Sequence, residues 1–309
     1  MTLNYPYSIK LVALDHSIDL AKSIADKLKG CELIEALHKL FPDGEVYVRI
    51  PSSLKDSVAI IIHRLYPNPN ERYLELLLLT EAANALDPYR IILVLPYLAY
   101  SRQDRRFLEG EPISIKALLS SLSEVGANIL LTVDVHKEHV LTYFKGLALN
   151  LYPKDEYASF IKHRYGSHDI IIIAPDKGAL ERAKKVAQKV STTYDYLEKY
   201  RDRVTGEVTY KPSEVNVKDK VVVLVDDIIS TGGTIAKAAR ILYSQGARSV
   251  NAICTHGLFV GNAIGKLKNN GVKDLATSNT IKVTSSEVIV IDIANLIAKK
   301  LINILNTIA

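Results

Sequence analysis

The sequence contains no tryptophan, one methionine and only two cysteines among 309 residues. The cysteines, Cys31 and Cys254, lie far apart in segments that we expect to be buried. A disulfide framework or a cysteine metal site needs clustered or regularly spaced cysteines, so neither is expected here. This sparse cysteine usage is typical of proteins from a reducing compartment, and we expect a cytoplasmic protein.

The sequence also lacks a long uninterrupted apolar run. Its longest apolar stretches are broken by Pro96 or by charged residues such as Asp292 and Lys299. A membrane span needs about 20 predominantly apolar residues in succession. We therefore expect neither a secretory signal segment nor a membrane partner.

Neither sign of charge dominates the sequence. The 39 basic and 34 acidic residues give a net charge of +5 and are interspersed along the chain. A nucleic-acid-binding protein would show a clustered basic stripe, so we expect no nucleic-acid partner, whereas a mildly basic surface suits anionic small ligands. At 48% apolar residues the chain can form a packed core, and its length predicts two domains of about 150 residues each.

Short apolar runs alternate with helical segments, which is typical of doubly wound α/β domains with mainly parallel sheets. The clearest predicted strands are residues 58–63, 91–95, 129–133, 170–174 and 221–225, and the clearest helices are residues 73–86, 112–125 and 234–245. A proline within a polar cluster at 150–155 predicts the domain boundary, which gives domains 1–150 and 151–309. Both halves repeat strand, polar loop and helix at similar spacing, without enough similarity to establish a duplication.

Residues 221–234, VVVLVDDIISTGGT, form the most informative segment. A strand buried on both faces is followed by two acids, a glycine turn and a helix, so the turn lies at the carboxyl edge of a parallel sheet. Backbone N–H groups and hydroxyls of residues 230–234 can bind a phosphate there, helped by the positive end of the helix. The turn has neither the lysine of a nucleotide P-loop nor the glycine spacing of a dinucleotide fold.

The acids of this segment narrow the choice of ligand. Asp226 and Asp227 would repel a phosphate unless they faced ribose hydroxyls or a metal ion. A ribose that carries a 5-phosphate satisfies both halves of the segment. The structural alternative is a helix N-terminus with two capping acids, although capping requires only one.

A second polar cluster follows the predicted strand at 91–95. Arg102, Arg105 and Arg106 fall within five positions, with Gln103 among them. Because arginine contacts phosphate oxygens through two N–H groups at once, this density suits a polyphosphate, and Gln103 could bind a base or a ribose. A solvated basic loop is the alternative.

Further acids and a histidine follow other predicted strands. We expect Asp134 and His136 to lie two positions apart on extended chain and to point to the same side, where they could hold a divalent ion or orient a general base. Asp176 follows the strand at 170–174 in a similar way. A capping aspartate beside a structural histidine is the alternative explanation of the first pair.

Two loop segments complete the set. Residues 41–45, FPDGE, predict a turn in which Phe41 could stack on a base while its acids bind the amino group or a ribose. Residues 195–207 predict a charged hairpin or lid, on which Lys199 and Arg201 could stabilise a phosphoryl-type transition state. A plain turn and a solvated loop are the respective alternatives.

In this order and spacing the clusters resemble the ribose-phosphate pyrophosphokinases over nearly the whole chain. The resemblance rests on residues 41–45, 70–79, 101–106, 134–136, 175–176, 199–201, 226–234 and 255–257. A phosphoribosyltransferase would share the loop at 226–234 but would lack the FPDGE and RQDR segments.

The resemblance implies two phosphoribosyltransferase-like domains and a magnesium-dependent transfer of the diphosphoryl group of ATP to ribose 5-phosphate, giving phosphoribosyl diphosphate and AMP. It implies a homo-oligomer in which the 41–45 segment reaches the ATP site of a neighbouring subunit. By position, ATP would be bound by Phe41, which stacks on adenine, and by Asp43, Gly44, Glu45, Arg102 and Gln103. Magnesium would be held at His136 and Asp176. Lys199 would be the catalytic lysine with Arg201 as its partner, and ribose 5-phosphate would be bound by Arg201, Asp226, Asp227, Ser230, Thr231, Gly232, Gly233 and Thr234.

The sequence departs from the family pattern at a few positions. Ser230 stands where many bacterial members have an aspartate, and Lys177 and Ala179 replace small residues or glycine after the Pro-Asp pair. None of these changes removes a proposed catalytic group. A catalytically silent regulatory relative and a phosphoribosyltransferase are the rival functions, and the intact lysine, arginine and histidine positions count against the first.

Overall fold

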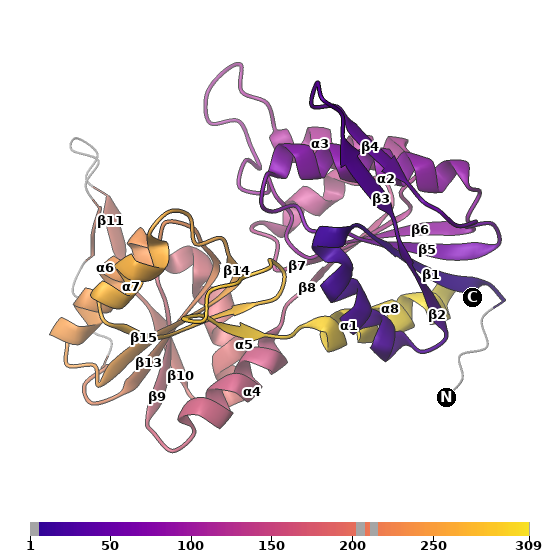
Figure 1. The fold of residues 1–309 in the computed structure, drawn as a ribbon. Helices are drawn as coiled ribbons and strands as arrows, with labels where there is room; N and C mark the ends of the chain where they lie inside the picture. Colours follow the sequence, from indigo (N-terminus) through magenta and orange to yellow (C-terminus); the bar gives the residue numbers. More distant parts are fainter. Residues whose placement is uncertain (1–5, 202–207, 211–215, 309) are drawn as a thin grey trace. The chain divides into compact units, whose positions relative to one another are not determined.

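A computed structural model of the chain describes residues 6–201, 208–210 and 216–308, and for residues 199–201 and 208–210 it describes the backbone only. The contacts divide the chain into two units (Figure 1). Unit 1 comprises Met1–Tyr152 together with Ile293–Ala309, and unit 2 comprises Pro153–Asp292.

Unit 1 is built on a six-stranded parallel sheet in the order β2-β1-β5-β6-β7-β8. Its strands are β1 (Ser8–Ala13), β2 (Cys31–Glu35), β5 (Ser57–Ile62), β6 (Arg90–Leu95), β7 (Ile129–Val133) and β8 (Leu147–Leu151). An antiparallel hairpin of β3 (Leu37–Leu40) and β4 (Val46–Arg49) follows β2. In Figure 1 this hairpin extends away from the sheet.

Unit 2 repeats this plan, with a parallel sheet in the order β10-β9-β13-β14-β15-β16. Its strands are β9 (Ile170–Ala174), β10 (Thr193–Tyr196), β13 (Val221–Ile229), β14 (Ser249–Gly257), β15 (Val272–Ser278) and β16 (Ile289–Ile291). The antiparallel pair β11 (Lys199–Arg201) and β12 (Val208–Tyr210) again follows the second strand. The expected doubly wound parallel architecture of both halves is confirmed.

Helices cover both sheets. In unit 1, α1 (Ile18–Leu28) and α8 (Ala294–Ile308) share one core cluster with the sheet, while α2 (Pro69–Ala85) and α3 (Ser114–Glu124) lie together on the opposite face (Figure 1). In unit 2, α6 (Gly233–Ser244) packs with α7 (Ala263–Asn269), and α4 (Lys154–Tyr165) packs with α5 (Leu180–Val190).

The C-terminal helix changes the division expected from the sequence. Ile297, Leu301 and Ile304 of α8 are buried in the core cluster of unit 1, which also contains residues of α1. Because an amphipathic helix must bury its apolar face, α8 belongs with the sheet that it covers rather than with the strands that precede it. The predicted boundary after residue 150 lies two residues from the observed one after Tyr152. The second observed boundary, before Ile293, was not predicted, because the sequence analysis assigned the whole C-terminal half to one domain.

The burial of the central strands agrees with their largely apolar composition. All residues of β5, β7 and β9 are buried, as expected for strands covered on both faces, and β7 and β9 have the bounds predicted from the sequence. The prediction that β13 ends at Val225 is wrong, since its ladder with β14 continues from Asp226 to Ile229. Both acids therefore lie on the strand, where backbone pairing fixes their position.

The composition of the sequence leads to two predictions, one about the cysteines and one about membrane-spanning segments. Cys31 and Cys254 are both free thiols. Across the described residues, no helix has both the length and the apolar character that crossing a bilayer requires.

The start of β8 depends on a glycine. A Cβ at Gly146 would lie 2.0 Å from the backbone oxygen of Asn128, which cannot rotate away as a side chain can. We expect Gly146→Ala to lower the free energy of unfolding by about 1–3 kcal/mol, measured by urea denaturation. Gly233→Ala is the control, because its nearest contact would be Thr231 Oγ1 at 3.9 Å. Equal midpoints for both variants would contradict the packing described here.

Candidate functional site

The carboxyl edge of the unit 2 sheet carries the main cluster of acids. The chain passes from β9 to β10 on one side and then returns to β13 on the other side of β9. In open α/β sheets such a reversal of strand order creates the crevice where ligands bind. Asp176 follows β9 at this point, while Asp226 and Asp227 lie near the end of β13.

These carboxylates oppose one another electrostatically. Asp227 is buried, and the pKa of Asp226 is raised well above its ordinary value by burial, then by the charge of Asp227, with Asp176 adding to the effect. The guanidinium of Arg182 on α5 lies 3.6 Å from Oδ2 of Asp227 and offsets part of this charge. Hydroxyl donors or a cation would relieve the remaining repulsion.

The phosphate-type turn follows directly. Gly232 has a φ of +72°, in the left-handed region, and α6 begins at the next residue. The turn is tied down by the Val260 N–H, which donates to the Ser230 oxygen at 3.0 Å, and by Lys266 Nζ, which donates to the Thr231 oxygen at 3.1 Å. With glycine at the N-cap, no capping side chain covers the first N–H groups of α6. Uncapped N–H groups at the positive end of a helix dipole are an arrangement that can bind an anion.

A pocket of about 380 Å³ lies beside the first acid. It is lined by Asp176, Lys177, Gly178, Tyr196 and Glu198. Asp176 accepts a hydrogen bond from the Gly178 N–H at 2.8 Å, which fixes its carboxylate at the end of β9. Glu198 directly precedes β11, which carries the expected catalytic pair Lys199 and Arg201; their side chains lie outside the described part of the structure.

Arg182 was missed in the sequence analysis. It lies on α5 between the exposed Glu181 and the buried Ala183, and its side chain is only 15% exposed. The available signal was an arginine beside the buried face of an amphipathic helix that starts just after Asp176. An arginine there suggests a buried acid nearby, but it does not identify which acid.

The nucleotide-type segment of unit 1 forms the tip of the β3–β4 hairpin. Phe41, Asp43, Gly44 and Glu45 are all exposed. The turn is closed by the Phe41 N–H donating to the Glu45 oxygen at 2.8 Å, and by the Glu45 N–H donating to Asp43 Oδ1 at 3.1 Å. Lys39 Nζ lies 4.6 Å from the Phe41 ring centroid. The structure thus presents an aromatic ring and two carboxylates to solvent on a hairpin.

The arginine-rich segment follows β6 in unit 1. Arg102 is exposed, whereas Gln103 is half-buried and its Oε1 accepts a hydrogen bond from Ser114 Oγ at 3.1 Å. Asp104 Oδ2 lies 3.5 Å from Nε2 of His139, which follows the neighbouring strand β7. The structure therefore brings the segments after β6 and β7 together.

Asp134 and His136 follow β7, but the expectation of extended chain between them is wrong. Asp134 is buried with a φ of +46°, in the left-handed region, and its N–H donates to the Leu151 oxygen at 2.7 Å. The Val135 N–H donates to Asn150 Oδ1 at 3.0 Å. These bonds to β8 turn the chain sharply, so the two-residue spacing no longer places both side chains on one side. His136 is half-buried at the edge of the sheet.

Gly232 provides a direct test of the turn. An alanine there would be strained at a φ of +72°, and its Cβ would lie 3.1 Å from Leu267 Cγ and 3.3 Å from the Ala263 oxygen. We expect Gly232→Ala to weaken the binding of ribose 5-phosphate about tenfold, since left-handed strain of about 1–2 kcal/mol shifts the N–H groups. Titration calorimetry would measure the Kd.

Gly30→Ala is the matched control for this experiment. It has a similar φ of +80° with nothing within 4 Å of the added Cβ, and it lies in unit 1. It should lose stability without losing affinity for ribose 5-phosphate. Unchanged affinity of folded Gly232→Ala would remove the turn from the ligand site.

Comparisons with known proteins agree with the two-unit division. Residues 9–126 match a family described as the N-terminal domain of ribose phosphate pyrophosphokinase, and residues 154–292 match one described as the phosphoribosyl transferase domain. The ribose-phosphate pyrophosphokinase of Saccharolobus solfataricus is 45% identical over 276 residues, which cover 89% of this chain and 94% of that protein. That of Pyrococcus abyssi is 43% identical, covering 84% of this chain and 89% of that protein.

A solved structure of a similar protein matches nearly the whole chain. The crystal structure of phosphoribosylpyrophosphate synthetase from Mycobacterium smegmatis superposes with a TM-score of 0.88 at 27% identity. The match covers 97% of this chain and 99% of that one.

Proposed function

The chain belongs to the ribose-phosphate pyrophosphokinase family, and on this basis we propose that it transfers the diphosphoryl group of ATP to the anomeric hydroxyl of ribose 5-phosphate, releasing AMP. The observation that carries the proposal is the acid pair of β13, half-buried Asp226 and buried Asp227, followed at once by the phosphate-type turn. A phosphorylated sugar is a ligand that supplies hydroxyls to the first and an anion to the second.

The sugar site lies wholly in unit 2. Asp226 and Asp227 accept hydrogen bonds from ribose hydroxyls, which relieves the repulsion that raises the pKa of Asp226. Ser230, Thr231, Gly232, Gly233 and Thr234 bind the 5-phosphate through N–H and hydroxyl groups. The contact of Arg182 with Asp227 orients that carboxylate.

Magnesium fits the donors that are present. Asp176 adds a carboxylate close enough to Asp226 to raise its pKa, so a hard cation would be stabilised between oxygen ligands. We assign one magnesium position to Asp176 in unit 2 and another to His136 in unit 1, each of which would hold an ion directly or through water. When bound, it would neutralise phosphate charge and orient the diphosphoryl group for in-line attack.

The remaining groups orient ATP and stabilise the transition state. Phe41, which is 39% exposed, stacks on adenine, and Asp43, Gly44 and Glu45 surround the nucleotide. Arg102 binds the polyphosphate, and Gln103, held by Ser114, contacts the base or ribose. Lys199 and Arg201 contribute positive charge where the transferred group develops negative charge.

The hairpin supports a shared site. Leu37, Leu40, Phe41 and Tyr47 are 37–50% exposed on β3, β4 and their turn in the single chain. Neighbouring apolar side chains on a projecting arm are typical of a protein contact. We assign this arm to an interface between two copies of the chain, through which Phe41 to Glu45 complete the ATP site of the neighbour.

Product identity tests the reaction. Purified protein with ATP, ribose 5-phosphate and magnesium should release AMP, separated from ADP by ion-exchange chromatography. Lys199→Ala should lower kcat about 10²-fold or more with a smaller effect on KM, because its contact forms mainly in the transition state. Release of ADP would refute the diphosphoryl transfer, and unchanged turnover of Lys199→Ala would remove β11 from catalysis.

The shared site is tested by complementation. In a two-fold dimer, a hybrid of an Asp43→Ala/Glu45→Ala chain with a Lys199→Ala chain has one doubly damaged site and one intact site. Co-expression of the two inactive variants should therefore restore up to about a quarter of wild-type activity, since half of the dimers are hybrids and half of their sites are intact. Demonstrated hybrid dimers without recovered activity would show that the hairpin acts within its own chain.

A further inference from the structure

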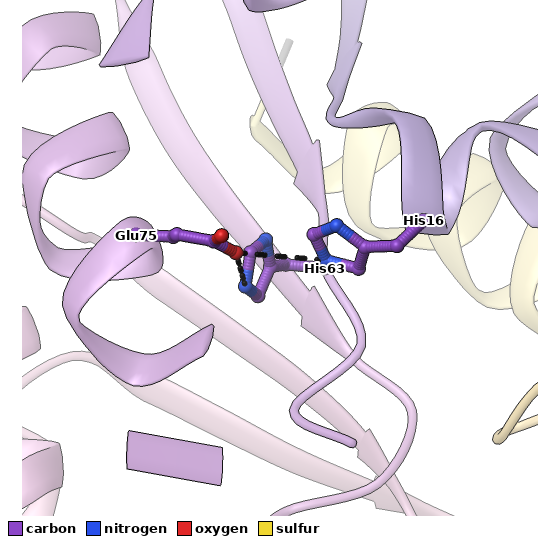
Figure 2. A group of neighbouring side chains, drawn as sticks. All are labelled: His16, His63 and Glu75. Atoms are coloured by element: carbon purple, nitrogen blue, oxygen red, sulfur yellow. Dashed lines mark ion pairs between the residues drawn. The ribbon is translucent and has the colours of Figure 1, made fainter. Parts of the chain in front are cut away.

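Unit 1 has a strand reversal equivalent to that of the sugar site. The chain passes from β1 to β2 and returns to β5 on the other side of β1, as it does from β9 to β10 and β13. His16 follows β1 in the short helix η1 (Asp15–Ser17), and His63 follows β5 directly. Glu75 extends from α2 toward both imidazoles (Figure 2). Both units therefore have polar side chains at the ends of the two strands on either side of the reversal, but these side chains are imidazoles in unit 1 and carboxylates in unit 2.

The three side chains converge on a small volume. Nε2 of His16 and Nε2 of His63 lie 4.0 Å and 3.8 Å from Oε2 of Glu75. One ligand atom of each residue lies within 4.8 Å of the others, and the Glu75 and His63 side chains are fully buried. Ligand atoms around a tetrahedral zinc ion at about 2.0–2.1 Å are roughly 3.4 Å apart, so a small contraction would bring Nε2 of His16 and Oε2 of Glu75 to bonding distance. His63, whose Nε2 is held by the Arg72 carbonyl, would bind through Nδ1.

One ring nitrogen of each imidazole lies within hydrogen-bond distance of an oxygen atom of the protein. Nδ1 of His16 lies 3.3 Å from Oδ1 of Asp15, and Nε2 of His63 lies 2.7 Å from the Arg72 carbonyl oxygen. Because these oxygens only accept, those nitrogens carry the hydrogens. The lone pairs are therefore on Nε2 of His16 and Nδ1 of His63, two buried atoms that have no hydrogen-bond partner. Metal-binding histidines show this same arrangement of one anchored nitrogen and one free lone pair.

One more imidazole lies against the Glu75 carboxylate. Nε2 of His38 lies 2.8 Å from Oε1 of Glu75 without hydrogen-bond geometry, so a third buried ring nitrogen borders the same carboxylate.

We propose that His16, His63 and Glu75 bind one divalent transition-metal ion of the Zn²⁺ class, separate from the magnesium of the reaction. Two imidazoles and one carboxylate are a preferred donor set for zinc, whereas magnesium prefers six oxygen ligands. The guanidinium of Arg72, which donates to both Glu75 oxygens at 2.6 and 2.8 Å, opposes the ion electrostatically. A carboxylate still has further lone pairs to offer a metal.

The site would connect elements beneath the nucleotide hairpin. His16, His63 and Glu75 come from the ends of β1 and β5 and from α2, and His38 lies on β3 shortly before Phe41. A bound ion would fix α2 to the sheet edge and, through Glu75 and His38, would restrict the base of the hairpin.

The experiment uses the full chain freed of metal by a chelator and then titrated with Co²⁺ in excess Mg²⁺. We expect one equivalent of cobalt per chain, seen as visible d–d absorption that stoichiometric Zn²⁺ removes. His16→Gln, His63→Gln and Glu75→Gln should each weaken the affinity at least tenfold, and Asp15→Asn about tenfold, because it anchors His16. His163→Gln, an exposed histidine on α4, should bind as wild type.

Thermal unfolding separates metal binding from a purely structural role. Zn²⁺ should raise the Tm of wild type and of His163→Gln, and should leave the Tm of the three ligand variants unchanged. Absence of cobalt binding by the folded wild type in Mg²⁺, or binding that His16→Gln and Glu75→Gln leave intact, would overturn the proposal. His38 and Glu71 form a second possible metal group with Glu75. If His38→Gln or Glu71→Gln abolished cobalt binding while His16→Gln and His63→Gln did not, the metal would be bound by that second group and the proposal would be overturned.

Discussion

Repulsion between carboxylates at the end of a buried strand is the constraint on which the sugar site depends. Pairing of β13 with β14 continues through Asp226, so the acid cannot withdraw into solvent, and the pKa of Asp226 is held well above its ordinary value by burial and by Asp227. Arg182 supplies one positive contact. The rest of the charge would be relieved by hydroxyl donors and a cation, next to the glycine turn and the start of α6, where we propose that the phosphate binds. The acids and the turn that we assign to the sugar and its phosphate thus lie next to each other in unit 2.

The two units use one plan for different purposes. Each has six parallel strands in equivalent order, and each inserts an antiparallel pair after its second strand. That insertion carries Phe41 to Glu45 in unit 1 and Lys199 and Arg201 in unit 2, so the residues that we propose for nucleotide contact and for catalytic charge lie in equivalent places of the two units. The strand reversals differ in chemistry, with carboxylates and a phosphate turn in unit 2 and imidazoles around Glu75 in unit 1. The equivalent strand order explains why both reversals hold clustered polar groups, because the crevice is a property of the strand order.

Much of this architecture follows from the sequence, because buried parallel strands are continuous apolar runs and β7 and β9 were predicted residue for residue. The extension of β13 could not be predicted, since two aspartates usually end a strand and only the ladder to β14 keeps them in it. The membership of α8 in unit 1 depends on which sheet its apolar face meets. The site residues of the turn and strand ends could be proposed from the sequence because they are contiguous, and their roles remain predictions. Arg182 and the group of His16, His63 and Glu75 were missed, since each comes from a separate element and no spacing marks it.

The central claim is that the acids select the sugar while the turn selects the phosphate. The most direct measurement compares ribose 5-phosphate and inorganic phosphate by titration calorimetry on wild type and Asp226→Asn. The account predicts that Asp226→Asn weakens ribose 5-phosphate binding at least tenfold, since a hydroxyl acceptor is lost, and leaves inorganic phosphate binding unchanged. Unchanged affinity for ribose 5-phosphate, or an equal loss for both ligands, would contradict it.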